Sequence, residues 1–130
     1  MNNLLIEKTK STPAIQFDTL SKVLKISGES FPENTAKFYT PVLEWLKVYI
    51  EQLDADTEVT VEFEIIYFNS STSKIFMTIF DMLEDAVEND KKICVNWRCD
   101  EKNETAIECG EEFKEDLDVL PFNLIIEGDQ

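Results

Sequence analysis

The stretch that most limits how this chain can fold is Thr57–Glu88, where a strand pattern changes directly into a helix pattern. From Thr57 to Ile65, apolar and polar residues alternate, as in a β-strand with one buried face. Residues 65–68 are all apolar, so we expect this end of the strand to be buried on both faces and to lie in the centre of a sheet. After Asn69, apolar residues recur at helical spacing: Ile75, Phe76, Ile79, Phe80, Leu83, Ala86 and Val87. A strand that leads into an amphipathic helix predicts a sheet covered by helices.

The same two periodicities divide the rest of the chain. Short apolar or alternating segments predict strands at Leu4–Lys8, Ala14–Asp18, Val23–Ser27, Lys92–Trp97 and Pro121–Ile126. The second and third of these are expected to form a hairpin through a turn at residues 19–22. Residues 28–34, which contain Gly28 and Pro32, are expected to form a loop.

Two more helices are expected, at Asn34–Leu53 and Ala106–Leu117. The first contains Pro41, which either kinks it or marks its true start, with Thr40 as the cap. We favour the kinked helix, capped by Asn34 or Thr35. The resulting order, β-β-β-α-β-α-β-α-β, predicts an α/β fold: one domain over residues 1–130, with a mixed sheet and helices packed across it.

Composition excludes several classes of protein. Apolar residues make up 43% of the 130, which is too many for a disordered chain. The 27 acidic residues outnumber the 12 basic ones and give a net charge of −15, so the phosphates of a nucleic acid would be repelled. Histidine is absent, which excludes Ser–His and Cys–His nucleophiles and the commonest transition-metal ligand. We therefore expect neither an enzyme nor a nucleic-acid-binding protein.

The cysteines predict a reduced compartment. Cys94, Cys99 and Cys109 are an odd set without a C-x-x-C pair, a poor basis for disulfides or for a zinc site. The N-terminal segment has no long apolar region, and no run approaches about 18 apolar residues. We expect a cytoplasmic protein with no membrane insertion, no metal and no cofactor.

The most suggestive segment for function is Asn69–Lys74, where four consecutive hydroxyl residues follow a buried strand. The free N–H groups of a helix's first turn attract anions, and a phosphoryl group on one of these hydroxyls would meet them, with Lys74 about one turn away. Ser, Thr and Asn also gather at helix starts simply because they cap helices. From spacing alone, plain capping is the more common explanation.

An acidic segment gives a second candidate surface. Residues 100–118 hold nine acidic side chains against two lysines. The segment could dock a basic partner, although a solvated helix face is the more usual role of such a run. An alternative function is therefore an unswitched acidic binding module, or an inhibitor that occupies a basic site on its partner.

Several segments together resemble the SiaC family of regulatory phosphoproteins, in the same order and with similar spacing over nearly the whole chain. They are Ser11–Gln16, Gly28–Asn34, Tyr67–Lys74, Ile79–Glu84 and Glu111–Asp116.

The resemblance implies a fold similar to STAS-type anti-sigma-factor antagonists and a partner-switching role. In that family a kinase phosphorylates a hydroxyl at the strand-to-helix junction and a PPM-type phosphatase removes the phosphate. In the best-known system of that family, the unphosphorylated form binds and activates a diguanylate cyclase, which raises cyclic-di-GMP and favours aggregation or biofilm. The phosphorylated residue is a threonine in the family and falls on Ser70 here, with Ser71 and Thr72 as alternatives. Asn69, Ser71, Thr72 and Lys74 are the expected partner-binding residues.

Overall fold

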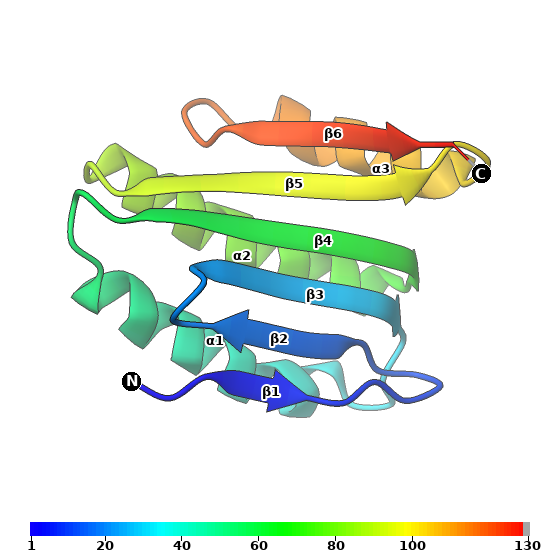
Figure 1. Ribbon diagram of the computed structural model, residues 1–130. Helices are drawn as coiled ribbons and strands as arrows, with labels where there is room; N and C mark the ends of the chain where they lie inside the picture. The colour runs from blue at the N-terminus through cyan, green and yellow to red at the C-terminus, as the bar shows by residue number, and fades with distance from the viewer. Residues whose placement is uncertain (129–130) are drawn as a thin grey trace.

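One mixed sheet of six strands organises the molecule, in a computed structural model that describes residues 1–128 (Figure 1). The strands lie side by side in chain order: β1 (Leu4–Ile6), β2 (Ala14–Asp18), β3 (Val23–Ser30), β4 (Glu58–Phe68), β5 (Lys92–Asp100) and β6 (Phe122–Glu127). β1, β2 and β3 pair antiparallel, whereas β3, β4, β5 and β6 pair parallel. The predicted hairpin is therefore confirmed, and the first strand forms one edge of the sheet.

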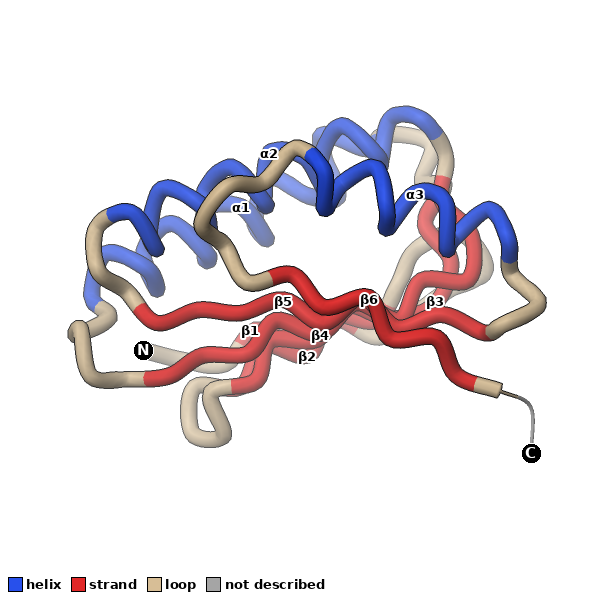
Figure 2. The backbone as a smooth tube through the Cα atoms, turned by 90° about the horizontal axis from the view of Figure 1, so that it is seen from above, coloured by secondary structure: helices blue, strands red, loops and turns tan. Residues whose placement is uncertain are grey.

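Three helices link the parallel strands: α1 (Thr35–Gln52), α2 (Ser70–Glu88) and α3 (Glu104–Glu115). All three cover the same face of the sheet, and the other face stays open (Figure 2). This follows from the strand order, because crossovers of one hand between successive parallel neighbours place every helix on the same side. The predicted α/β fold with a mixed sheet is confirmed.

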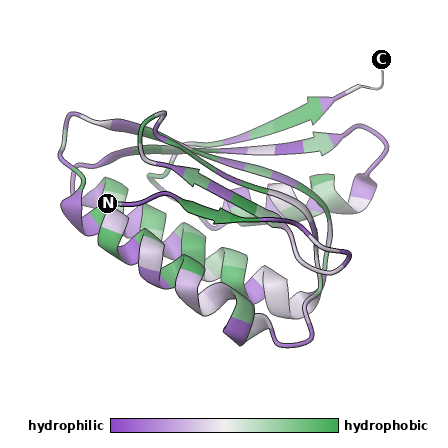
Figure 3. Ribbon diagram, turned by 60° about the horizontal axis from the view of Figure 1, so that its bottom comes forward, coloured by the Kyte–Doolittle hydropathy of each residue, from purple (hydrophilic) through white to green (hydrophobic). Residues whose placement is uncertain are grey.

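The core lies between the sheet and the helices and is rich in aromatic side chains. Trp97 of β5 is fully buried and lies within 6.1 Å, between ring centroids, of Phe63, Phe76 and Phe113. In Figure 3 apolar and polar residues are interleaved along strands and helices, as expected when each element buries one face.

Two expectations about β3 and β4 were wrong. β3 continues through Gly28, which has a φ of +114°, to Ser30, so residues 28–30 are strand and not loop. Opposite this point the register changes: Gly28 pairs with Ile65 but Glu29 pairs with Tyr67, which leaves Ile66 as an extra, bulged residue. Ile66 and Tyr67 are 64% and 51% exposed, because no helix covers the open face, so this end of β4 is not buried on both faces.

The first helix runs without interruption through Pro41. Its N-cap is Asn34, whose side chain accepts a hydrogen bond from the N–H of Lys37. The alternative start with Thr40 as cap is therefore wrong. Thr40 lies within the helix, and its hydroxyl donates to the Ala36 carbonyl at 2.6 Å. Thr40 directly precedes Pro41, which has no N–H to donate to the helix.

Helix α3 can pack closely on the sheet because residue 110 has no side chain. A Cβ atom at Gly110 would lie 2.6 Å from Trp97 Cδ1 and 2.8 Å from Leu124 Cδ1, both too close for a real contact. We predict that Gly110→Ala lowers the free energy of unfolding by about 1–3 kcal/mol, since an added methyl overpacks this interface. Urea denaturation would measure the change. A Gly110→Ala protein as stable as the parent would show that α3 can move away freely.

The loop from α3 to β6 is held by one carboxylate on α2. Glu84 accepts hydrogen bonds of 2.8–2.9 Å from the backbone N–H groups of Asp118, Val119 and Leu120. Burial alone would raise the pKa of Glu84, but these three donors outweigh it and lower that pKa.

We predict that Glu84→Gln lowers Tm by roughly 2–5 °C at neutral pH, because an amide cannot accept from all three donors as well as a carboxylate. Since the pKa is lower in the folded state, the benefit is complete above the usual glutamate pKa of about 4.3 and disappears as the pH falls through the folded-state pKa. Thermal melts of both proteins from pH 7 to 3 should therefore converge. A constant difference in Tm would contradict this.

Candidate functional site at the β4–α2 junction

The junction between β4 and α2 is fixed to its neighbours by hydrogen bonds. Asn69 is the N-cap of α2, and its side chain accepts from the N–H of Thr72 at 2.9 Å. The N–H of Asn69 donates to the Ser30 carbonyl at the end of β3 at 3.1 Å. The hydroxyl-rich segment is therefore a capped helix start, as its Asn, Ser and Thr residues and their spacing predicted.

The hydroxyls of this segment lie in different environments. Ser70 and Ser71 are exposed, as is Lys74, whereas Thr72 is fully buried. The backbone N–H groups of Ser70 and Ser71 are in the first helical turn, where no intrahelical acceptor is available. No acidic residue occupies that turn, so the positive end of the helix dipole stays unneutralised. The junction can therefore accept an anionic group near Ser70 or Ser71.

Behind the exposed serines, three hydroxyls form a buried chain. Ser30 Oγ lies 2.7 Å from Tyr39 OH and 2.9 Å from Thr72 Oγ1, and the Thr72 hydroxyl donates to the Ser30 carbonyl at 3.1 Å. All three groups are satisfied if Tyr39 donates to Ser30 and Ser30 to Thr72. Burial raises the pKa of Tyr39 to about 12, although the hydrogen bond with Ser30 opposes this, so Tyr39 remains a neutral donor at physiological pH.

Sequence reasoning did not single out Ser30 and Tyr39. Tyr39 stands on the apolar face of its helix, so its pattern is that of an ordinary core residue. Ser30 falls in the segment expected to be a loop, and its burial becomes evident only once β3 is seen to extend to it. A local sequence signal for Ser30 does not exist, because its partners are 9 and 42 residues away.

An apolar platform borders the junction on its exposed side. It consists of Phe31, Ile66 and Tyr67, all at least 39% exposed, with the rings of Phe31 and Tyr67 edge-to-face at 5.8 Å. The Asn103 side chain donates to the Ile66 carbonyl at 2.9 Å and links the platform to the start of α3. Beside the platform, a recess of about 200 Å³ lies between Tyr67 and the α3 residues Thr105 and Cys109. Apolar side chains exposed in this way are typical of contact surfaces.

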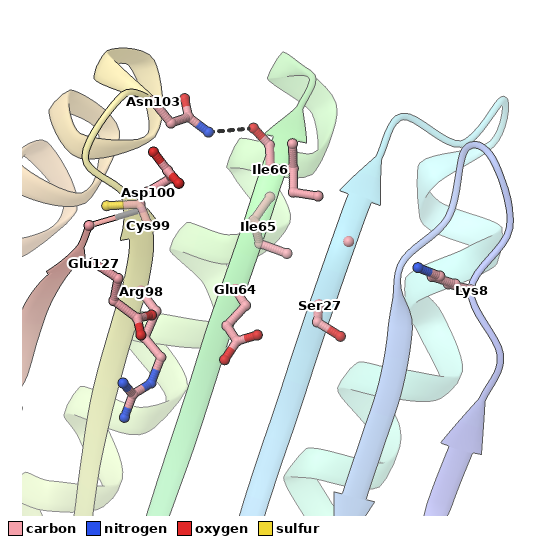
Figure 4. Close-up of a pocket in the computed structure, with 12 residues that line it drawn as sticks. Lys8, Ser27, Glu64, Ile65, Ile66, Arg98, Cys99, Asp100, Asn103 and Glu127 are labelled. Carbon is pink, nitrogen blue, oxygen red and sulfur yellow. Dashed lines mark hydrogen bonds between the residues drawn. The ribbon is translucent and has the colours of Figure 1, made fainter. Parts of the chain in front are cut away.

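A larger hollow, of about 600 Å³, lies on the open face of the sheet (Figure 4). Two of its charged side chains pair with charged groups on neighbouring strands: Arg98 Nε lies 2.8 Å from Glu62, and Glu64 lies 3.3 Å from Lys25 Nζ. Burial would raise the pKa of Glu62, but its contacts with Arg98 and Asn96 lower it. These contacts favour the ionised form of Glu62.

The described residues suggest neither a metal site nor a membrane span. Within residues 1–128, no three His, Cys, Asp or Glu side chains are grouped so that they could hold a metal ion. Each of the three cysteines is free. Over the same residues, no helix has the length and apolar character needed to cross a membrane.

Three segments of the chain meet at this junction. The N–H of Phe31 donates to the Ser11 carbonyl at 2.8 Å, while Asn69 and Thr72 both donate to the Ser30 carbonyl. Ser11–Gln16, Gly28–Asn34 and Tyr67–Lys74, which carry the resemblance noted above, are therefore neighbours in space. A family model described as SiaC family regulatory phosphoprotein matches residues 6–127.

The chain belongs to the SiaC family. It is 34% identical over 122 residues, which are 94% of either chain, to an uncharacterised protein of Pseudomonas aeruginosa strain UCBPP-PA14. A solved structure of SiaC of P. aeruginosa superposes with a TM-score of 0.88 at 31% identity, covering 98% of this chain and all of that one. A structure of the diguanylate cyclase SiaD in complex with its activator SiaC, from the same species, matches with a TM-score of 0.89 at 32% identity, over 95% of this chain and 99% of that one.

Removing a hydroxyl from the buried chain of Ser30, Tyr39 and Thr72 should lower stability more than removing an exposed hydroxyl on the same helix. Thr72→Val keeps the shape of the side chain but removes a buried hydroxyl that serves Ser30, so we expect a loss of about 1–3 kcal/mol in unfolding free energy. Thr78→Val is the matched control, because Thr78 is exposed on the same helix and should change stability by about 0.5 kcal/mol or less. Urea denaturation of both variants measures the free energy of unfolding. Equal losses in the two variants would contradict a stabilising role of the buried hydroxyl chain.

Proposed function

We propose that this protein is a non-enzymatic regulatory phosphoprotein that is phosphorylated on Ser70 and, when unphosphorylated, binds and activates a diguanylate cyclase. The observation that carries the proposal is the exposed Ser70 at an unneutralised helix N-terminus, in a family described as regulatory phosphoproteins. The complex of a family member with a diguanylate cyclase supports the choice of partner. The remaining parts of the system are a protein kinase and a PPM-type phosphatase, acting in the cytoplasm.

The three candidate hydroxyls are not equally suited to modification. Thr72 is fully buried and bonded to Ser30, so a kinase would have to open the helix start to reach it. Ser70 and Ser71 are both exposed. We take the modified residue to be the one immediately after Asn69, as the family resemblance implies, which favours Ser70. A phosphate there would meet the free N–H groups of the first turn and could approach Lys74.

The physical effect of such a phosphate is large enough for a switch. It adds roughly −1.5 to −2 units of charge at neutral pH, next to the apolar platform. To change a partner from mostly bound to mostly free, the binding free energies of the phosphorylated and unphosphorylated forms must differ by about 3–5 kcal/mol. The cost of removing water from a dianion at an interface can account for this difference in binding free energy. The same phosphate can accept new hydrogen bonds from a different partner.

The first test locates the modification. Protein recovered from its native cells is analysed by intact mass and peptide mapping, before and after treatment with a PPM-type phosphatase. We expect a phosphatase-sensitive mass increment of one phosphate on Ser70. An unmodified chain under all growth conditions would leave Asn69 and Ser70 as an ordinary cap, and would favour the unswitched acidic binder.

The second test measures the effect on the partner, with P. aeruginosa SiaD as the probe. We predict that Ser70→Ala binds SiaD like the parent and raises its cyclic-di-GMP synthesis, whereas Ser70→Asp binds at least about tenfold more weakly. Titration calorimetry and cyclase assays give both readouts. Thr78→Asp controls for added charge elsewhere on α2, and Ser71→Asp tests the alternative site. Equal affinity of the Ala and Asp variants at position 70 would contradict the switch.

A further inference from the structure

The last strand, β6, has one side that is open for pairing. Within residues 1–128 it pairs with β5 alone, and Figure 1 shows it at the rim of the sheet with α3 behind it. The Pro121 and Glu127 carbonyls, at the two ends of β6, each accept at 2.9 Å, from the N–H groups of Val95 and Glu101. Backbone groups of successive strand residues point to alternate sides, so residues 121, 123, 125 and 127 face β5. Residues 122, 124 and 126 therefore present their N–H and C=O groups outward.

The β6 edge lacks the features that usually protect an edge strand. Lysines, prolines, bulges or a very short strand normally keep a sheet edge from pairing with another chain. β6 is six residues long, pairs with β5 in regular register, and contains no Lys or Pro. Leu124, Ile125 and Ile126 follow one another in it, and Ile126 is 50% exposed. At the opposite edge β1 is only three residues long and is followed by Lys8 and Lys10, so β6 is the less protected edge.

The surroundings of the β6 edge differ on its two sides. Cys109 of α3 lines the recess beside Tyr67, so helical spacing places Ile107 and Glu111 on the opposite side of α3, next to the outward edge of β6. Ile107 is partly buried against the core. On the open face, the strand ends with the exposed carboxylate of Glu127. A chain added here would meet apolar side chains towards α3 and negative charge on the open face.

Charge argues against a second copy of this chain as the occupant. Each copy carries a net charge of −15, and residues 100–118, which include α3, hold nine acidic side chains against two lysines. Pairing of two β6 strands about a two-fold axis would bring two such helices side by side, where their charges repel. A basic segment has the complementary charge.

We infer that the β6 edge accepts an extended segment of a partner protein as a seventh strand, in which apolar and basic residues alternate. Main-chain hydrogen bonds to the outward groups of Leu124 and Ile126 provide affinity, and the alternating side chains provide specificity. The apolar side chains face α3 near Ile107, and the basic ones lie on the open face near Glu127. Because β5 separates this edge from β4 and Ser70, the inference goes beyond the proposed switch and does not rest on it.

The probe is a labelled synthetic peptide of four Val-Lys repeats, and its binding is measured by fluorescence anisotropy. A peptide of the same composition, with its valines and lysines in two separate blocks, controls for attraction by charge alone. We expect the alternating peptide to bind at least about fivefold more tightly than the block peptide, because only alternation places all lysines on one face of a strand. Equal binding of the two peptides would overturn the inference.

A pair of variants at position 126 tests the main-chain bonds. Ile126→Pro removes an outward N–H without removing a bond to β5, and Ile126→Ala removes the same side chain but keeps the N–H. We expect the proline variant to bind the alternating peptide at least about fivefold more weakly than the alanine variant, since a peptide carbonyl loses its donor. Glu127→Lys should weaken binding more than Asp56→Lys, an equal change of charge in the turn before β4. Equal affinity of the Pro and Ala variants would contradict strand addition.

Amide hydrogen exchange of the parent gives a second readout that needs no variant. The peptide should slow exchange at Leu124 and Ile126 more than at Asn123 and Ile125, whose N–H groups already face β5. Absence of this alternation would overturn the inference. Sedimentation of the parent alone tests the other occupant, because a dimer that Ile126→Pro dissociates would assign the edge to a second copy. Since the probe is a peptide and not SiaD, failure here leaves the proposed function intact.

Discussion

The position of the candidate site depends on a single carbonyl group, that of Ser30 at the end of β3. It accepts from the N–H of Asn69 and from the hydroxyl of Thr72, while the Ser30 side chain bonds with Tyr39 of α1 and with Thr72. One residue thus ties α1, β3 and the start of α2 together within the protein interior, where hydrogen bonds are strong and their loss is costly. The exposed serines of α2 are presented on a rigid support and not on a loop.

The bulge in β4 explains why apolar side chains surround that support. Without Ile66 as an extra residue, strict alternation would turn Tyr67 towards the helices and Phe68 away from them. With it, Phe68 reaches the core, where its ring lies 5.3 Å from that of Phe76, and Tyr67 stays exposed against Phe31. The bulge interrupts the regular pairing of β3 and β4 by one residue. As a result, the exposed apolar platform lies directly before the helix start.

The sequence was informative where signals are local and repeated. Alternation in Thr57–Ile65 and helical spacing after Asn69 predicted β4 and α2 nearly to their ends, and the free thiols and the acidic charge were evident from counts. The exposure of Ile66 and Tyr67 could not be predicted, because it depends on all three helices covering one face and on a register change at Gly28. The junction was found from its hydroxyls, whereas Ser30 and Tyr39 were missed because their role arises from distant contacts. The likeness to STAS-type antagonists stays a prediction.

The charge of this protein constrains how a phosphate can act on it. At the helix start a phosphate meets unpaired N–H groups and the positive end of the dipole, so it should stabilise the fold and not disrupt it. Towards a basic partner, added negative charge at a distance would strengthen attraction and would act in the wrong direction for release. A phosphate can weaken such a complex only where contact strips it of water. In the proposed switch, Ser70 would meet that condition because it follows Asn69 directly, three residues after Tyr67 of the platform. The position of the hydroxyl, more than its charge, would then decide the sign of the proposed switch.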